Sequence, residues 1–221
     1  SSLYQPIYGE TTHKNLKEFE KRIEIIKQHI PDGSSVIDIG CNYGWNCFKL
    51  SENKTLKITG VDEFPERTKM SGNELYYYLA NKTIKKYGIT NVKILMGGPP
   101  SYTKHDYGIA TYILHHYLKD PLKLSKGLND DGQKLNKAIQ QSANKLILQI
   151  RHKDHDQHIP FYESIGYTNL KQIDSWTCER GSGCCNGILK SPLIIGESDN
   201  LIICTSEISG FIGLVNNYIV L

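Results

Sequence analysis

Apolar residues near the start of the chain follow a helical period. Five of them lie three or four positions apart: Leu16, Phe19, Ile23, Ile26 and Ile30. This spacing predicts an amphipathic helix packed on a core, within an N-terminal helical segment at residues 1–33. Further along, residues 34–40 (SSVIDIG) form a short apolar run without alternation, which is typical of a strand buried on both faces of a parallel sheet.

The same two patterns divide the rest of the chain. Apolar runs predict six more strands, at residues 56–62, 91–96, 107–114, 145–150, 167–176 and 200–207. Helical patterns lie at residues 45–52, 65–88, 121–127, 132–143 and 157–166. Pro65 suits a first helical turn, and Gly88 suits a C-terminal cap. Residues 177–199 are rich in glycine, cysteine and serine, and we expect an insertion loop there.

The order of strands and helices predicts the fold class. Strands that alternate with helices imply crossover connections and a doubly wound, mostly parallel α/β sheet. No helix is predicted between the last two strands, so we expect the sheet to end in an antiparallel pair. The chain has 221 residues and no internal repeat, and we expect one domain over residues 1–221.

Composition narrows the functional classes without choosing among them. Hydrophobic residues make up 39% of the chain, which is enough for a core. The net charge of +3, with four arginines, permits an anionic partner without predicting one. No apolar stretch approaches the roughly 20 residues of a membrane span, and no signal peptide is visible, so we expect no membrane association. The chain begins without methionine, which indicates a trimmed chain or a piece of a longer polypeptide.

The cysteines indicate the compartment. Six of them are scattered along the chain: Cys41, Cys47, Cys178, Cys184, Cys185 and Cys204. Two of the six lie close to the glycines that follow the first predicted strand. This pattern does not resemble a disulfide framework, so we expect a reducing, intracellular and cytoplasmic location.

The turn after the first strand is the strongest functional signal. The segment VIDIGCNYGW (residues 36–45) ends a strand with Asp38, and Gly40 and Gly44 allow the backbone to bend and to approach a ligand. The GxGxxG dinucleotide fingerprint and the P-loop lysine are both absent. Asp62 ends the second strand 24 residues after Asp38, where an acid is placed to accept hydrogen bonds from ribose hydroxyls. Asp38 is placed to accept from a ligand ammonium group.

Three segments together resemble a known family. VIDIGCNYGW, ITGVD and YGIATYILHHYLKDP are similar to the core of class I S-adenosylmethionine-dependent methyltransferases, over roughly residues 36–150. The resemblance implies a seven-stranded Rossmann-like sheet with a reversed final strand, and S-adenosyl-L-methionine as the cofactor. Two departures concern the cofactor pocket. Asn42 replaces the middle glycine of the usual GxGxG, and Gly97 and Gly98 stand where an adenine-contacting acid is common.

The resemblance also implies which residues form the site. The first turn would hold the methionine part, the acid after the second strand would bind ribose, and the segment after the fourth strand would border the methyl group. The implied cofactor residues are Asp38, Gly40, Cys41, Asn42, Tyr43, Gly44, Asp62, Glu63, Gly97, Gly98, Ile113 and Leu114. The implied catalytic residues are His115, His116 and Tyr117. A histidine there acts as a base or orients the acceptor, or it only packs beneath the cofactor.

Two further clusters carry weaker signals. His152, His155 and His158 lie three positions apart, and a solvated polar loop is favoured there over substrate contact or a metal site. Cys178, Cys184 and Cys185 lack the C-x2-C spacing of zinc sites, and a substrate lid is favoured over a thiol or metalloid site. We therefore predict no metal.

The sequence thus predicts methyl transfer from S-adenosylmethionine to RNA or to a small molecule. The segments GCN and LHHYLKDP resemble branches that act on RNA ends or wobble uridines, and some small-molecule enzymes. One alternative is a non-catalytic cofactor-binding subunit, or a domain of a larger viral or modular protein, that supports a protein partner. A second is a thiol or metalloid methyltransferase, suggested by Cys47. A third is a nicotinamide-dependent enzyme, against which the missing third glycine argues.

Overall fold

A computed structural model describes residues 5–13, 15–62, 72–99, 102–150, 152, 155–178 and 189–198. Its α-helices are α1 (Leu16–Gln28), α2 (Trp45–Leu50), α3 (Gly72–Tyr87), α4 (Asp130–Ser142) and α5 (His158–Ser164). Its strands are β1 (Ser35–Ile39), β2 (Lys57–Asp62), β3 (Val92–Met96), β4 (His105–Thr111), β5 (Ala143–Gln149), β6 (Tyr167–Cys178) and β7 (Leu189–Ser198). Short 3-10 helices are η2 (Leu114–Tyr117), η3 (Leu124–Lys126) and η4 (His155–Gln157).

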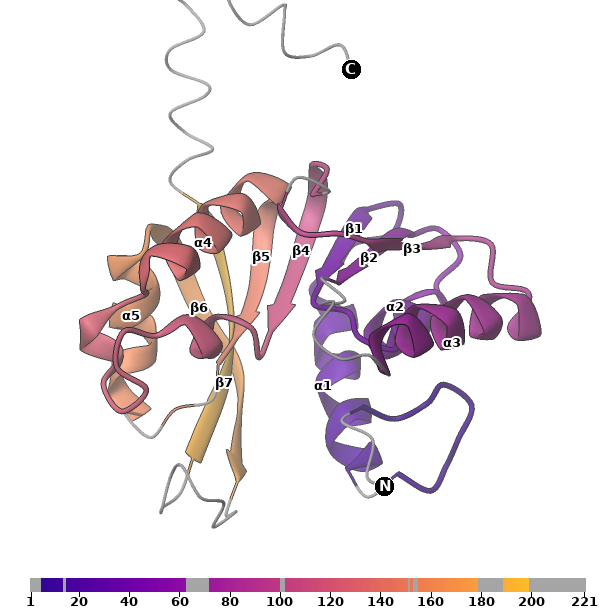
Figure 1. Cartoon of the computed structure of the whole chain (residues 1–221), viewed down its shortest axis with the longest axis horizontal. Coiled ribbons are helices and arrows are strands. Elements are labelled where there is room, and N and C mark those ends of the chain that lie inside the picture. The colour runs from indigo at the N-terminus through magenta and orange to yellow at the C-terminus, as the bar shows by residue number, and fades with distance from the viewer. Residues whose placement is uncertain are drawn as a thin grey trace, which may run out of the picture.

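The seven strands form one mixed sheet in the order β3-β2-β1-β4-β5-β7-β6 (Figure 1). Strands β1 to β5 pair in parallel, whereas β7 runs antiparallel to both of its neighbours. The predicted fold class, a doubly wound α/β sheet with an antiparallel final strand, is therefore confirmed. The strand order reverses between β1 and β4, and such a switch point is where open α/β sheets bind ligands.

Helices cover the sheet in two layers, each with its own apolar core. On one side, Leu135 and Ile139 of α4 and Phe161 of α5 pack with β4, β5 and β7. On the other side, Ile23 of α1 and Phe48 of α2 pack against β2, β3 and the reverse face of the central strands. Figure 1 shows α4 and α5 apart from α2 and α3, on opposite sides of the sheet. The burial of both faces explains why the central strands read as continuous apolar runs.

The last strand is not where the sequence pattern placed it. The apolar run at residues 200–207 was expected to form it, but that run lies outside the described residues. Strand β7 instead occupies Leu189–Ser198, inside the range expected as an insertion loop, residues 177–199. This strand contains Pro192, although proline cannot donate a hydrogen bond to a ladder. The structure accommodates Pro192 because β5 pairs with β7 only as far as Leu193, which leaves β6 alone beside the proline.

Two helical predictions have different outcomes. The helix expected at residues 65–88 is confirmed from Gly72 to Tyr87, and its C-terminal Gly88 has the expected left-handed φ of 61°. Residues 65–71, with Pro65, lie outside the described residues. The stretch 121–127 contains only the three-residue η3, because this chain segment folds back through an antiparallel bridge between Leu118 and Leu128. Within the described chain, no helix combines the length and the apolar character that a membrane crossing requires.

Candidate functional site

The turn between β1 and α2 has an unusual backbone, which its residues make possible. Gly40, Asn42 and Gly44 have φ values of 71°, 52° and 82°, in the left-handed region that glycine and asparagine tolerate best. Asparagine therefore replaces the middle glycine of the turn without abolishing its shape. The N–H groups of Gly40 and Cys41 both donate to the Val61 carbonyl, at 2.8 and 3.1 Å, so the turn is fastened to the end of β2.

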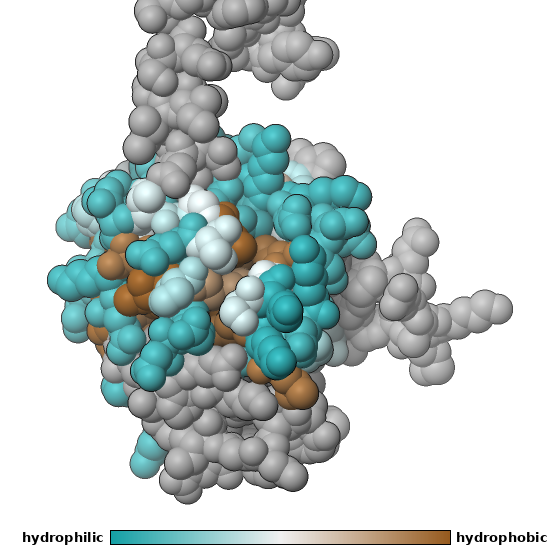
Figure 2. Space-filling model, turned by 90° about the vertical axis from the view of Figure 1, so that its left-hand side faces the viewer, coloured by the Kyte–Doolittle hydropathy of each residue, from teal (hydrophilic) through white to brown (hydrophobic). Residues whose placement is uncertain are grey.

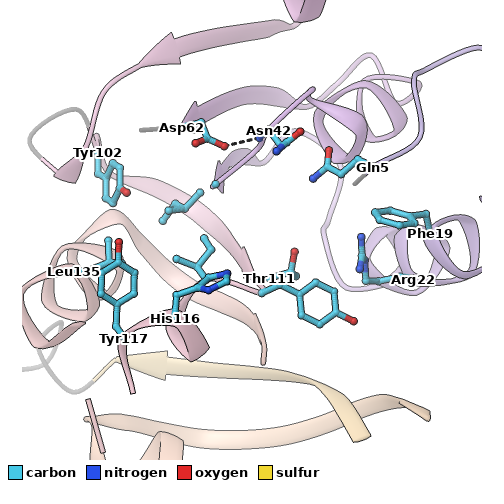
Figure 3. Close-up of a pocket in the computed structure, with 14 residues that line it drawn as sticks. Gln5, Phe19, Arg22, Asn42, Asp62, Tyr102, Thr111, His116, Tyr117 and Leu135 are labelled. Atoms are coloured by element: carbon cyan, nitrogen blue, oxygen red, sulfur yellow. Dashed lines mark hydrogen bonds between the residues drawn. The ribbon is translucent and has the colours of Figure 1, made fainter. Parts of the chain in front are cut away.

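Asp62 ends β2 and faces this turn. Its Oδ2 accepts a hydrogen bond of 2.7 Å from the Asn42 backbone N–H, and both residues line the same pocket. The Asn42 side chain is held in turn, because its Oδ1 accepts from the Tyr43 N–H at 2.9 Å. The bond fixes one carboxylate oxygen of Asp62 at the rim of the turn, as Figure 3 shows.

The pocket lies at the carboxyl ends of β1, β2 and β4 and encloses about 830 Å³. That volume suits a drug-sized ligand. Figure 3 shows side chains from separate parts of the chain that point into one space. Its lining residues are Gln5, Phe19, Arg22, Ile39, Gly40, Asn42, Asp62, Tyr102, Thr111, Tyr112, Ile113, His116, Tyr117 and Leu135.

Arg22 brings a buried positive charge to this pocket from α1. Its residue is 2% exposed, and its guanidinium lies 4.4 Å from the centre of the Phe19 ring and 5.4 Å from that of Tyr112. The buried Nε has no hydrogen-bond partner, and no ion pair joins Arg22 to a carboxylate within the described chain. Two aromatic faces satisfy a guanidinium only in part, so Arg22 retains capacity for an anionic ligand.

The N-terminal segment closes one side of the same pocket. Gln5 is 6% exposed, and its Oε1 is a buried acceptor without a hydrogen-bond partner in the described chain. The segment is anchored by Tyr8, whose ring makes edge contacts with Trp45, Phe48 and Tyr87. Gln5 thus offers the pocket an acceptor beside the cation of Arg22.

The segment after β4 forms the opposite wall. Tyr112 has a left-handed φ of 61°, and its N–H donates to the buried Gln149 carbonyl at 2.7 Å, which turns the chain out of the sheet. Non-glycine residues with this backbone are uncommon and cluster at functional sites. A Cβ on Gly40 would lie 2.7 Å from Cδ1 of Ile113, so the two walls touch at this glycine.

His116 presents its imidazole to the pocket from η2. The ring lies 4.0 Å from that of His115, centre to centre, and is among the side chains that line the cavity (Figure 3). Partial burial lowers the pKa of His116 below its ordinary value, which favours the neutral ring near pH 7. A neutral imidazole is able to accept a proton.

Asp38 lies behind the turn, where it is 1% exposed and does not line the pocket. Burial raises the pKa of Asp38 to about 7, against the opposing effects of hydrogen bonds from Asn46 and Cys47 and the charge of Arg22. Asn46 Nδ2 lies 3.4 Å from Oδ1, and Cys47 Sγ lies 3.6 Å from Oδ2. Direct contact between Asp38 and a ligand ammonium group stays a prediction.

The structure brings together six of the residues singled out in the sequence. These pocket-lining residues are Gly40, Asn42, Asp62, Ile113, His116 and Tyr117. Eight others do not line the pocket: Asp38, Cys41, Tyr43, Gly44, Gly97, Gly98, Leu114 and His115. Tyr43 instead packs on Tyr76, with ring centres 4.3 Å apart. Glu63 lies outside the described residues.

The structure describes only part of the two weaker clusters. His152 and His158 are 3% and 2% exposed, so the solvated loop expected there is wrong for these two side chains. Nε2 of His152 lies 3.0 Å from the Pro121 carbonyl oxygen. No group of three or more potential metal ligands occurs among the described residues. Cys184 and Cys185 lie outside them.

Sequence reasoning missed the pocket residues that come from distant elements. Gln5, Phe19, Arg22, Tyr102 and Leu135 reach the site from the N-terminal segment, α1, the β3–β4 connection and α4. Arg22 carried a usable signal, because it is a charged residue within the buried face of α1 beside Phe19 and Ile23. Tyr102 and Leu135 carried none, since nothing in their local sequence separates them from ordinary core residues.

Comparisons with known proteins identify the fold. No family model and no curated protein matches the sequence. Among solved structures, the N-terminal domain of EvdMO1, studied with S-adenosylhomocysteine and D-fucose, has a TM-score of 0.58 at 11% identity, covering 85% of this chain and 84% of that domain. The chain spans 45% of the length of whole EvdMO1.

Two other solved structures are similar. The YcgJ protein from Bacillus subtilis has a TM-score of 0.57 at 12% identity, covering 81% of this chain and 98% of that one. Precorrin-6y C5,15-methyltransferase from Geobacter metallireducens has a TM-score of 0.51 at 12% identity, covering 88% and 94%. The chain has the fold of the class I S-adenosylmethionine-dependent methyltransferases.

Proposed function

We propose that this protein transfers a methyl group from S-adenosyl-L-methionine to an acceptor that binds beside His116. One observation carries the proposal. Two charged residues line the same pocket. Asp62 stands at the end of β2, and Arg22 of α1 is a buried cation without an ion pair in the described chain. S-adenosylmethionine has a ribose and a carboxylate that match these two groups. The fold supports the same cofactor, since a similar domain was studied with S-adenosylhomocysteine.

The cofactor contacts follow from the groups on each side of the turn. Asp62 would accept hydrogen bonds from the ribose hydroxyls. Arg22 would bind the methionine carboxylate, and the bare backbone at Gly40 would let the sulfonium chain pass close to β1. A carboxylate at Arg22 would offset the cost of burying a guanidinium among aromatic rings. Asp38 would favour the ligand ammonium from behind the turn.

The acceptor end of the pocket is aromatic and carries no permanent charge among the described residues. Tyr102, Tyr117 and Leu135 line it, with His116 at its edge. This lining fits an uncharged ring, as in a nucleobase or a small cyclic molecule. The cofactor supplies a methyl group that is already activated, so the protein has chiefly to align the acceptor and exclude water. His116 would accept the proton of a hydroxyl or amine acceptor.

The thiol and metalloid alternative has less support. Cys47 is completely buried and lies outside the pocket lining. A hydrogen bond with Cys41 and burial raise the pKa of the Cys47 thiol well above its ordinary value, so it is a poor thiolate. Because Cys41 and Cys47 are both free thiols, we also propose a reducing compartment such as the cytoplasm.

A label-transfer assay tests the proposal. The protein is incubated with S-adenosylmethionine labelled in its methyl group and with separate pools of RNA and of small cyclic molecules. We expect label in one of the pools and loss of transfer in His116→Gln. Cofactor binding without transfer to any acceptor would instead support a non-catalytic cofactor-binding module that serves a partner protein. Binding of a nicotinamide cofactor in place of S-adenosylmethionine would contradict both the methyltransferase and the non-catalytic hypothesis.

A further inference from the structure

The proposed function leaves one buried polar residue of the pocket, Gln5, without a role. Polar side chains at the surface meet water, as Figure 2 shows for the hydrophilic residues on the side that carries α4 and α5. Gln5 is only 6% exposed, and its Oε1 has no hydrogen-bond partner within the described chain. Because a buried amide oxygen without a partner costs free energy, its place in the pocket lining points to a hydrogen-bond donor on a ligand.

The N-terminal segment at residues 5–13 is docked on the fold close to Gln5. Three residues further along, the ring of Tyr8 makes edge contacts with Trp45 of α2 and Tyr87 of α3, at ring-centre distances of 6.4 and 5.2 Å. Gly9 follows with a left-handed φ of 86°, and a Cβ there would collide with the Tyr87 hydroxyl. Aromatic packing and a glycine that permits close approach therefore hold the segment in place.

The same aromatic contacts connect the segment to Arg22. The Trp45 ring makes an edge contact with that of Phe19 at 6.4 Å, and the Arg22 guanidinium lies 4.4 Å from the centre of the Phe19 ring. Phe19 and Arg22 line the pocket together with Gln5, and Figure 3 draws all three toward one end of it. The segment and α1 thus place a neutral acceptor and a buried positive charge on the wall of one cavity.

This pair of groups matches the two charges of an α-amino acid. The carboxylate and the ammonium are attached to one carbon, so a ligand whose carboxylate binds Arg22 brings its ammonium to the same end of the pocket. An ammonium group has three N–H donors and no acceptor, and it needs acceptors from the protein. Gln5 supplies one without a negative charge, which would pair with Arg22 and compete with the ligand carboxylate. Asp62, the acid of the lining, is assigned to the ribose.

We propose that Gln5 accepts a hydrogen bond from the α-ammonium group of S-adenosylmethionine, and that the docked ring of Tyr8 holds Gln5 in place for it. This inference rests on the proposed function, because it assigns a residue to one end of the same cofactor. Gln5 is a binding residue, and Tyr8 is a positioning residue that acts through it. A hydrogen bond to a charged group is roughly twice as strong as one between neutral groups, so its loss is measurable.

The test uses two ligands that differ by one group. Calorimetry measures S-adenosylhomocysteine, which carries the ammonium group, and its desamino analogue, in which hydrogen replaces that group. Gln5→Leu should lower the affinity for S-adenosylhomocysteine about 10-fold and leave that for the analogue within about twofold, because only the first ligand loses a bond to a charged group. Gln28→Leu, at the exposed C-terminal end of α1, is the matched control and should change neither affinity.

A second variant tests the positioning role. Tyr8→Leu removes the ring contacts that fasten the segment. It should lower the affinity for S-adenosylhomocysteine by less than Gln5→Leu does, and it should spare the desamino analogue. In Gln5→Leu/Tyr8→Leu the loss should equal that of Gln5→Leu alone, because the two residues serve one interaction. A merely structural role of Tyr8 would lower the affinity for both ligands equally and would add to the effect of Gln5→Leu.

Each result for Gln5→Leu supports or overturns the inference. Selective loss of S-adenosylhomocysteine binding supports it, and retained binding of the desamino analogue shows that the variant is folded. Equal loss for both ligands would show that Gln5 only shapes the cavity, and no loss for either would show that the ammonium group binds elsewhere; both results overturn the assignment while the wild type still binds the cofactor. A folded wild type that binds neither ligand would instead overturn the proposed function, and this inference with it.

Discussion

The turn after β1 and the segment after β4 form opposite walls of one pocket, but they are built by different means. The turn is shaped by its backbone. Three residues have left-handed φ values, and backbone N–H groups donate hydrogen bonds to the end of β2 and to Asp62. The segment after β4 forms its wall with side chains. His116 and Tyr117 project from a short 3-10 helix, and Tyr102 of the β3–β4 connection and Leu135 of α4 line the same pocket.

The difference explains what each wall is able to recognise. A backbone cradle fits a ligand that never changes, because its shape is set by a few residues with a required conformation. A wall of side chains from distant elements is easily altered without disturbing the sheet. We therefore expect the cofactor side to be sensitive to small changes in backbone and charge, and the acceptor side to tolerate them without loss of cofactor affinity.

The largest expected effect comes from adding a side chain at Gly40, in the turn after β1. Gly40→Val adds a side chain where a Cβ already lies 2.7 Å from Ile113, so cofactor affinity should fall at least ~100-fold, or about 2.8 kcal/mol. Gly33→Val is the control, because Gly33 also has a positive φ of 80° but nothing within 4 Å of its Cβ position. Both variants lose stability through backbone strain. Calorimetry with S-adenosylhomocysteine should show lost affinity in Gly40→Val alone.

The next effect concerns the buried cation. Arg22→Met removes the charge proposed to bind the methionine carboxylate, so affinity for S-adenosylhomocysteine should fall about 10- to 100-fold, the scale of hydrogen bonds to charged groups. The free energy of unfolding should not fall, because a buried guanidinium without an ion pair is replaced by an apolar chain. Methylthioadenosine, which lacks the carboxylate, should bind both proteins equally. An equal loss for both ligands would contradict the assignment.

A third effect is a pH dependence of stability set by Asp38. Its pKa in the folded protein is about 7, above the ordinary 3.8, so its neutral form is the one that folding favours. The stability it contributes is present below about pH 4 and is lost as the pH rises through 7. Between pH 5 and 8 the wild type should therefore lose about 2 kcal/mol of unfolding free energy relative to Asp38→Asn. Urea unfolding of both proteins at the two pH values measures this. An equal change of unfolding free energy in wild type and Asp38→Asn would refute it.

A smaller effect is expected at the ribose acid. Asp62→Asn keeps an oxygen that accepts from the Asn42 N–H but removes the negative charge. Cofactor affinity should fall by about 1 kcal/mol, or about fivefold, the difference between charged and neutral acceptors. The affinity of S-adenosylhomocysteine measured by calorimetry at constant pH checks this. Unchanged affinity would show that the ribose binds elsewhere.

The smallest effect should occur on the acceptor wall. His116→Gln should leave the affinity for S-adenosylhomocysteine within about twofold of wild type, because His116 lies at the acceptor end and not beside Asp62 or Arg22. His115→Gln serves as the neighbouring control, since its ring does not line the pocket. A large loss of cofactor affinity in His116→Gln would contradict the assignment of the cofactor to one wall and the acceptor to the other.

The contrast between the two walls also explains how much of the structure could be predicted from the sequence. Strands β1 to β5 were predicted within one to three residues because a buried parallel strand is a local apolar run. Gly40, Asn42 and Asp62 were identified for a related reason, since a turn and its facing acid lie at fixed places after two strands. Strand β7 was misplaced because the glycine, cysteine and serine content of residues 177–199 predicted a loop, whereas the apolar run at residues 200–207 matched a strand pattern.

The side chains contributed by distant elements were out of reach for a physical reason. Gln5, Tyr102 and Leu135 reach the pocket only through packing of the N-terminal segment, the β3–β4 connection and α4 on the sheet. Their local sequence is the same whether they face a ligand or a core. Arg22 was the exception that periodicity could have found, as a cation on the buried stripe of α1.

The most direct test of this account is a calorimetric titration of the protein with S-adenosylmethionine, S-adenosylhomocysteine and NAD in parallel. The account predicts micromolar binding of the first two and none of NAD, because Asp62 and Arg22 line the pocket and are proposed to bind the ribose and the carboxylate, and the turn lacks the glycine fingerprint of a pyrophosphate site. Binding of NAD, or no binding of S-adenosylmethionine and S-adenosylhomocysteine by the folded protein, would contradict it.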